Sequence, residues 1–141
     1  MTLSSPIAPF VWKPVYSVHV RAMDAQHAEL IRIVHDLQQA MSEGRGKEVL
    51  SGILERLVSY TKDHFASEER LLRRHAYPSF EEHKAEHERL TATVSAYLSG
   101  HRSGRIALTV EVLGFLKSWL EKHILGLDKQ YGIYLNSRGV N

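Results

Sequence analysis

The sequence predicts an all-α protein, an up-down-up-down antiparallel four-helix bundle with an extended N-terminal arm and a short C-terminal tail. Four segments of helical length carry apolar side chains at helical spacing, and short turn signals separate them. Hydrophobic residues make up 43% of the chain and charged residues 24%, which is ordinary for a globular protein. At 141 residues, we expect one domain over residues 1–141 with its own core.

The charge balance and the residue counts exclude several classes of protein. Lys and Arg total 18 against 16 Asp and Glu, so the net charge of +2 gives no basis for binding nucleic acid or an anionic membrane. The absence of cysteine excludes disulfides, thiolate zinc sites and iron–sulfur clusters. With no apolar run of membrane-spanning length and no signal-peptide pattern, we expect a cytoplasmic protein. The count of 9 histidines is unusual and requires an explanation.

The arm and the first helix are set by prolines and by a polar cap. Three prolines within residues 1–20 exclude a helix there, and large apolar side chains such as Phe10 and Trp12 predict an arm that packs on the body. Asp24 is a plausible N-cap for a first helix over about 24–43. The glycines at 44 and 46 would end that helix.

Three more helices follow in the same way. The second is expected over about 47–75 and ends before Pro78. The third is expected over about 79–99, with Ser79 and Glu82 in a capping-box pattern. After a turn at 100–104, the fourth is expected over about 105–125 and is ended by Gly126. The tail, 126–141, is apolar enough to dock on the bundle.

Two pairs of ligand-type residues stand at helical spacing in the middle of the chain. His64 and Glu68 are four residues apart, as are His83 and His87, so each pair shares one helix face. The break at Pro78 lets the second of these helices fold back on the first. The two histidine-bearing faces are therefore expected to meet, either in water or around a metal ion.

Other ligand-type residues fall on the apolar stripes of the first and fourth helices, at His27 and His123. A carboxylate without a partner in such a core costs several kcal/mol, and a cation would remove that cost. Asp128 lies five residues after His123, about 140° away on a regular helix. We expect Gly126 to end the helix and let the chain turn Asp128 back toward His123.

The inward-facing set exceeds what one ion needs. It consists of His27, His64, Glu68, His83, His87, His123 and Asp128. Two six-coordinate ions offer roughly twelve positions, and five imidazoles, two bridging carboxylates and a bridging oxygen leave about one open. This nitrogen and oxygen set favours iron or manganese over zinc.

A plainer interpretation is that these histidines are core residues whose hydrogen bonds go to the two carboxylates. A cluster of buried ionisable groups is unusual, which favours the metal. Four other histidines are expected to have no ligand role, with His35 at the edge of the bundle, His75 at a helix end and His101 in a turn: His19, His35, His75 and His101.

The chain resembles the hemerythrins, in particular the single-domain bacteriohemerythrins. The matching motifs are W at 12 with YSV at 16–18, DAQH at 24–27, HFASEE at 64–69, YP at 77–78, HKAEH at 83–87, and WLEKH at 119–123 followed by Asp128. They span nearly the whole chain. A single HxxxH is weak evidence, whereas all seven ligand positions in order are specific.

The resemblance implies reversible O2 binding at a non-haem di-iron centre, for oxygen storage, delivery or sensing. Two Fe ions with a bridging oxo or hydroxo group would be the cofactor and O2 the ligand. The resemblance assigns His83, His87 and His123 to one iron, His27 and His64 to the other, which keeps an open position, and Glu68 and Asp128 to both. It places an apolar pocket around the O2 position: Leu30, Phe65, Trp119, Leu120 and Ile124.

Two other functions stay open at this stage. One is a di-iron redox enzyme acting on peroxide or nitric oxide, although the carboxylate-rich Glu-x-x-His ligation of the ferritin-like oxidases is missing here. The other is an iron or redox signalling protein that works through a separate partner. We expect a binding protein and not an enzyme, with O2 as its partner and an oxygen-using enzyme as a further one. Small anions or nitric oxide could also bind the open iron.

Overall fold

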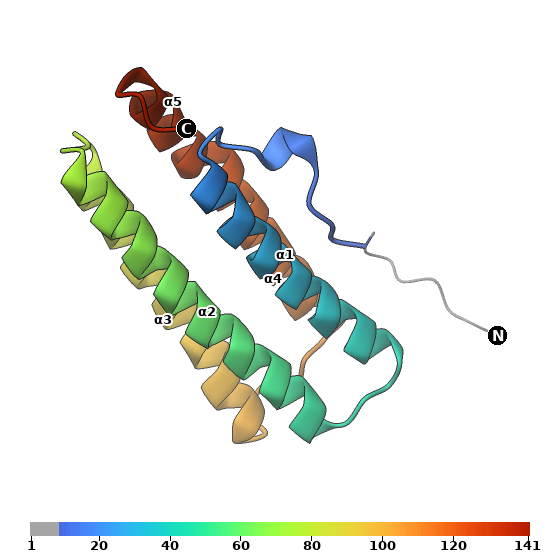
Figure 1. The fold of residues 1–141 in the computed structure, drawn as a ribbon. Helices are drawn as coiled ribbons and strands as arrows, with labels where there is room; N and C mark the ends of the chain where they lie inside the picture. The colour runs from blue at the N-terminus through green and yellow to red at the C-terminus, as the bar shows by residue number, and fades with distance from the viewer. Residues whose placement is uncertain (1–8) are drawn as a thin grey trace.

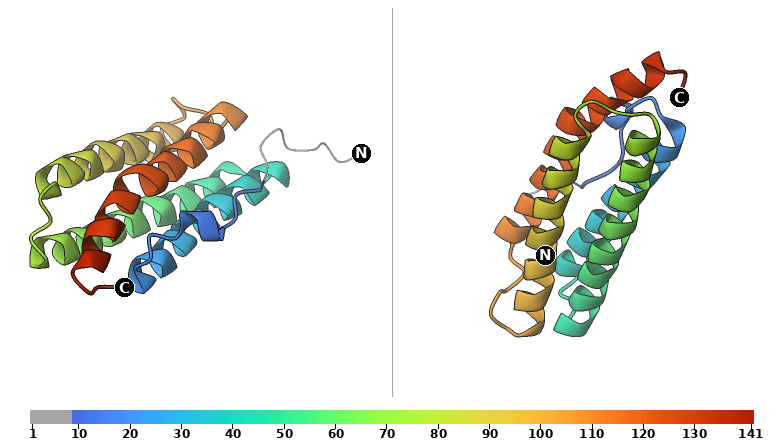
Figure 2. Two further views of the ribbon diagram at one scale, coloured as in Figure 1. Left: turned by 90° about the horizontal axis from the view of Figure 1, so that it is seen from above. Right: turned by 90° about the vertical axis from the view of Figure 1, so that its left-hand side faces the viewer.

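The computed structural model describes residues 9–141, and within them it consists of helices and short connections (Figure 1). The elements are η1 (Pro14–Tyr16), α1 (Arg21–Ser42), α2 (Lys47–Arg74), α3 (Phe80–Arg102), α4 (Val110–His123), η2 (Ile124–Asp128) and α5 (Lys129–Ser137). The four long helices run alternately up and down, with α1 packed between α2 and α4, and α2 between α1 and α3 (Figure 2). This confirms the predicted four-helix bundle. Among the described residues, no helix is long and apolar enough to cross a membrane.

The described part of the arm packs on the bundle as expected. Phe10 is 2% exposed and Val18 is 1% exposed. The Phe10 backbone N–H donates to Gln38 Oε1 at 3.2 Å, and the Tyr16 hydroxyl donates to Glu121 Oε2 at 2.7 Å. Residues 1–8, which include one of the three prolines used in the prediction, lie outside the described residues.

The predicted cap of the first helix was wrong. The helix begins at Arg21, after Val20, and Asp24 lies inside its first turn. The Asp24 carboxylate instead accepts hydrogen bonds from the Ser17 hydroxyl at 2.6 Å and the Val18 backbone N–H at 2.8 Å. Asp24 therefore fastens the arm to α1.

The ends of α3 also differ from the prediction. Ser79 stands at the N-cap, but its side chain makes no capping hydrogen bond, so the capping box is not formed. The helix continues to Arg102, so it includes the first residues of the stretch 100–104 that was predicted to be a turn. Gly100 is a packing glycine, because a Cβ there would lie 2.4 Å from Ile106 Cδ1. The connection after α3 can thus fold back closely on its last turn.

The fourth helix begins five residues later than predicted, at Val110, because the Thr109 side chain caps it by accepting from the Val112 backbone N–H at 3.2 Å. Gly126 does not end it. The chain passes through the π-helical turn η2 and continues as α5, so most of the predicted tail is helical. The tail docks as expected: Tyr131 and Leu135 are fully buried.

Candidate metal centre

Seven ligand-type side chains from five elements meet inside the bundle, and each is 6% exposed or less. They form two groups that could hold metal ions, with all ligand atoms of a group within 4.8 Å of one another. The groups are Glu68, His83, His87, His123 and Asp128, and His27, His64, Glu68 and Asp128. The structure therefore brings together every residue that the sequence placed in the set. The two carboxylates belong to both groups.

The helical spacing of two pairs works as the sequence suggests. On α2, His64 Nε2 lies 3.1 Å from Glu68 Oε2, one turn further along the same face. On α3, the rings of His83 and His87 lie 4.5 Å apart between centroids. His27 from α1 completes one side of the cluster, its ring 4.7 Å from that of His64.

The π-helical turn η2 aims Asp128 at the cluster. In a regular α-helix, residues five apart would point about 140° away from each other. The i→i+5 hydrogen bonding of a π-turn adds a residue to the turn and brings such a pair onto one face. His123 Nε2 accordingly lies 3.2 Å from Asp128 Oδ1. The expected proximity is present, but through a widened turn and not through an end of the helix at Gly126.

Glu68 presents one carboxylate oxygen to each group of histidines. Its Oε1 lies 3.0 Å from His83 Nε2 and 3.0 Å from His87 Nε2. Its Oε2 lies 3.2 Å from His27 Nε2 and 3.1 Å from His64 Nε2. A carboxylate whose two oxygens face two nitrogen groups is placed to link two cations.

Asp128 divides its oxygens in the same way. Its Oδ2 lies 3.0 Å from His27 Nε2, while Oδ1 lies 3.2 Å from both His83 Nε2 and His123 Nε2. Both oxygens are buried and neither has a well-aligned hydrogen-bond donor. The centre therefore has two carboxylates that each span the same two groups.

The protein groups alone leave the cluster unsatisfied. Burial lowers the pKa of His27, but the adjacent Asp128 and Glu68 carboxylates outweigh it and raise that pKa to about 10. The same balance raises the pKa of His83 to about 9. Burial raises the pKa of Glu68, yet the surrounding imidazoles hold it well below its ordinary value. Both ring nitrogens of His123 are also buried without a hydrogen-bond partner.

Cations would satisfy these atoms. Metal ions pair the two charged carboxylates and accept the free Nε2 lone pairs, so the cluster would need no extra protons. The donor set of imidazoles and carboxylates without a thiolate suits iron or manganese. The residues present therefore fit a centre of two ions.

Three residues outside the predicted set hold the cluster in place. Gln26 Oε1 accepts from His64 Nδ1 at 2.7 Å, and Glu69 Oε2 accepts from His87 Nδ1 at 2.7 Å. The Tyr131 hydroxyl donates to Glu68 Oε2 at 2.6 Å, and burial raises its pKa well above the ordinary value. Sequence reasoning missed all three. The available signal was position: Gln26 and Glu69 each adjoin a predicted ligand, and Tyr131 follows Asp128 by one helical turn.

The five apolar residues of the predicted pocket are all buried in the core. Their exposed fractions are 0% for Leu30, 4% for Phe65, 7% for Trp119, 1% for Leu120 and 0% for Ile124. Phe65 stacks on the ring of His87 with centroids 3.7 Å apart and planes within 5°. Its ring also lies 5.6 Å from that of His123. Apolar side chains thus pack directly against the histidine cluster.

The histidines assigned no ligand role lie outside the cluster. His19 is exposed, and His35 and His75 are half-buried. The prediction that His101 lies in a turn was wrong: it is a buried residue of α3, with Nδ1 2.9 Å from the Ser51 hydroxyl.

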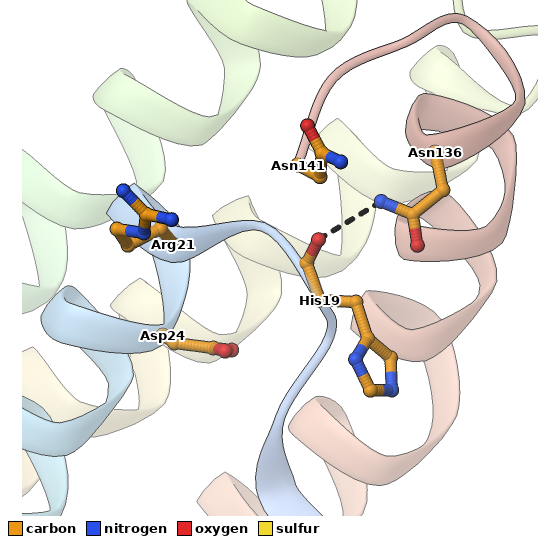
Figure 3. A pocket seen from close by; sticks show the side chains of 5 residues that line it. All are labelled: His19, Arg21, Asp24, Asn136 and Asn141. Atoms are coloured by element: carbon orange, nitrogen blue, oxygen red, sulfur yellow. Dashed lines mark hydrogen bonds between the residues drawn. The ribbon is translucent and has the colours of Figure 1, made fainter.

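Surface clefts lead toward the centre from two sides. One, of about 470 Å³, reaches Trp119 and His123 between α3 and α4, and another, of about 440 Å³, lies over Phe65 and His87. A wider hollow of about 670 Å³ lies where the arm meets α5 (Figure 3). There Asn136 Nδ2 donates to the His19 carbonyl at 2.9 Å. That hollow shares none of the seven cluster residues, and its lining is His19, Arg21, Asp24, Asn136 and Asn141.

Comparison with known proteins points to one family. The model of the hemerythrin HHE cation-binding domain matches residues 18–132. A bacteriohemerythrin of Pseudomonas paraeruginosa is 33% identical over 128 residues, which cover 89% of this chain and 80% of the relative. A myohemerythrin of Sipunculus nudus is 27% identical over 123 residues, covering 87% and 91%. The crystal structure of a wild-type hemerythrin superposes with a TM-score of 0.83 at 28% identity, covering 89% of this chain and 96% of the other.

Proposed function

This chain belongs to the hemerythrin family, and from that premise we propose that it binds O2 reversibly at a centre of two non-haem iron ions. One observation carries the proposal. Both carboxylates of the cluster turn one oxygen toward the His27 side and the other toward the His83 side. Two carboxylates that each link the same two positions suit a pair of ions. A single ion would leave one oxygen of each carboxylate without a partner.

The proposed ligands divide unequally between the two ions. Three histidines would hold one ion, two histidines would hold the other, and the carboxylates and a bridging oxo or hydroxo group would be shared. The assignments are His83, His87 and His123 for the first ion, His27 and His64 for the second, and Glu68 and Asp128 for both. The ion with fewer protein ligands keeps a position for O2. When bound, the iron pair would supply the electrons that O2 takes up on binding and returns on release.

The protein's own part is to orient the ligands and to exclude water. Outer hydrogen bonds fix the rings of His64 and His87, so that both direct Nε2 into the cluster. Leu30, Leu120 and Ile124 are at most 1% exposed and would keep water and protons away from bound O2. Slow access of protons would favour release of O2 unchanged.

The centre also bears on how the chain is organised. Its proposed ligands come from α1, α2, α3, α4 and η2. Together the two groups need side chains from all four long helices, which supports the proposal that the chain acts as a single domain.

The experiment starts from metal-free protein loaded with ferrous iron without oxygen. Iron per chain is counted, O2 is admitted, and the visible spectrum is followed while O2 is then removed. We expect two irons per chain and an absorption band that appears with O2 and disappears when O2 is removed. Direct conversion to a stable ferric form, or rapid catalytic consumption of peroxide or nitric oxide, would instead indicate a redox enzyme and refute the proposal.

A further inference from the structure

The two groups of histidines differ in the charge of their outer hydrogen-bond partners. On the three-histidine side, His87 Nδ1 donates to the carboxylate of Glu69 at 2.7 Å. On the two-histidine side, His64 Nδ1 donates to the neutral amide of Gln26 at 2.7 Å. The hydrogen bonds have equal length and the acceptors have nearly the same shape. The difference between them is one negative charge.

The surroundings fix the orientation of His87 on one side and of Gln26 on the other. A carboxylate can only accept, so His87 must carry its proton on Nδ1 and turn a lone pair on Nε2 toward the cluster. The parallel Phe65 ring fixes the plane of His87 from one side. Gln26 Nε2 donates to the Ser67 hydroxyl at 3.2 Å, which orients the amide so that its oxygen faces His64.

A third contact adds to the same asymmetry. Tyr131 donates its hydroxyl to Glu68 Oε2, the carboxylate oxygen that faces His27 and His64. A donor draws electron density from that oxygen and makes it a weaker ligand. The other oxygen, Oε1, faces His83 and His87 and receives no such donor from tyrosine.

These contacts have a common electrostatic consequence. An anion behind an imidazole makes the imidazole a stronger donor and favours the higher charge on the metal that it binds. A neutral amide such as that of Gln26 has a weaker effect on its imidazole. The hydrogen bond from Tyr131 to Glu68 weakens a ligand on the two-histidine side, and so disfavours the higher charge on the metal there. Each contact favours ferric iron at the three-histidine position and ferrous iron at the two-histidine position.

We propose that Glu69 and Gln26 are positioning residues that set unequal reduction potentials for the two irons, with the iron at His83, His87 and His123 the more easily oxidised. This inference rests on the proposed di-iron function. It assigns to the chain a built-in order of oxidation, in which the fully ligated ion is oxidised ahead of the ion with the open position. The electron comes from the ferrous ion, and the oxidant is O2 or an added mediator.

The test exchanges the two acceptors in iron-loaded protein and measures the midpoint potential by spectroelectrochemistry. Glu69→Gln keeps an acceptor for His87 but removes the charge, so we expect a more positive potential and about tenfold slower oxidation in air. Gln26→Glu is expected to shift the potential to a more negative value. Because the Glu carboxylate can accept from the Ser67 hydroxyl, that contact is preserved. In the double exchange, the net potential is expected to return toward the wild-type value.

The matched control is Glu86→Gln. Glu86 adjoins His87 in sequence, its side chain is 22% exposed like that of Glu69, and it pairs with Arg89 instead of an imidazole. We expect its potential to stay near that of the wild type. If Glu69→Gln and Glu86→Gln shift the midpoint potential equally, the inference is overturned. The loss of a nearby charge would then explain both shifts without the hydrogen bond to the imidazole.

Iron counts separate this inference from the function on which it rests. If the wild type and the variants hold two irons and bind O2 reversibly while all potentials coincide, only the inferred asymmetry fails. If the wild type does not take up two irons, the proposed function itself fails.

Discussion

Replacing Tyr131 with phenylalanine isolates one buried hydrogen bond of the centre. The side chain is fully buried, and its hydroxyl donates to Glu68 Oε2 at 2.6 Å. Phenylalanine keeps the ring and leaves no cavity larger than the lost oxygen, so packing changes little. The carboxylate is expected to stay charged in the metal-free protein because the imidazoles hold its pKa low. The change therefore removes a charge-assisted hydrogen bond and nothing else of comparable size.

Such a bond to a charged group contributes about 1.5–3 kcal/mol to the free energy of unfolding. For a chain of this length, that corresponds to a melting temperature lower by roughly 4–10 °C. The assay is urea unfolding of the metal-free protein followed by circular dichroism, with an unchanged slope as evidence that the unfolding transition is the same.

Tyr134→Phe is the matched control, because the Tyr134 hydroxyl donates to the uncharged His75 carbonyl, also at 2.6 Å, at a half-buried position of the same helix. We expect it to cost about 0.5–1.5 kcal/mol. A loss for Tyr131→Phe no greater than the control would refute the reasoning that a charged acceptor makes this bond strong.

Three other predictions concern packing, pH and metal binding. Gly132→Ala should destabilise the protein by about 1–3 kcal/mol, because the new Cβ would lie 2.3 Å from the Val18 carbonyl oxygen, whereas Gly126→Ala, with no atom within 4 Å, should be neutral or stabilising by up to about 1 kcal/mol in the same urea assay. Burial lowers the pKa of His101 in the folded protein. When the pH falls below the ordinary pKa of histidine, the unfolded chain therefore binds a proton more readily than the folded protein, and stability falls. Between pH 7 and 5, His101→Gln should therefore lose less stability than the wild type, by up to about 1.4 kcal/mol per pH unit, and equal losses would contradict this. Asp128→Ala should lower the affinity for iron by at least tenfold, measured as iron retained per chain after dialysis against a chelator, since Asp128 is a proposed ligand in both groups.

The sequence predicted the bundle because its evidence is local. Apolar periodicity determines which face of each helix is buried, and Pro78 and the glycines at 44 and 46 mark where helices end. The i, i+4 spacing of His64 and Glu68 places both on one face wherever the helix packs. Once the stripes were assigned, convergence of the ligand-type residues followed from the topology of the bundle.

The missed features depend on contacts that each residue makes outside its own helix, which the spacing within that helix does not reveal. Asp24 resembles a helix cap, and only the position of the arm shows that its carboxylate accepts from residues 17 and 18. Gly100 resembles a turn residue, yet its lack of a side chain accommodates Ile106. Gln26 and Glu69 are ordinary polar residues of a half-exposed helix face until α1, α2 and α3 are placed together.

The π-turn η2 shows most clearly how the centre shapes the fold. A π-turn has poorer hydrogen-bond geometry than an α-helix and is rare, so its presence requires a compensating interaction. Gly126 does not explain it, because the position has open space around it and no left-handed backbone. The compensation lies in what the turn positions: Asp128 beside His123, and Tyr131 one turn later against Glu68. A regular α-helix here would rotate Asp128 by about 100° relative to His123 and carry Tyr131 with it. The added residue in this turn therefore positions both carboxylates of the centre. It directs Asp128 toward the cluster, and it places Tyr131 where its hydroxyl can donate to Glu68.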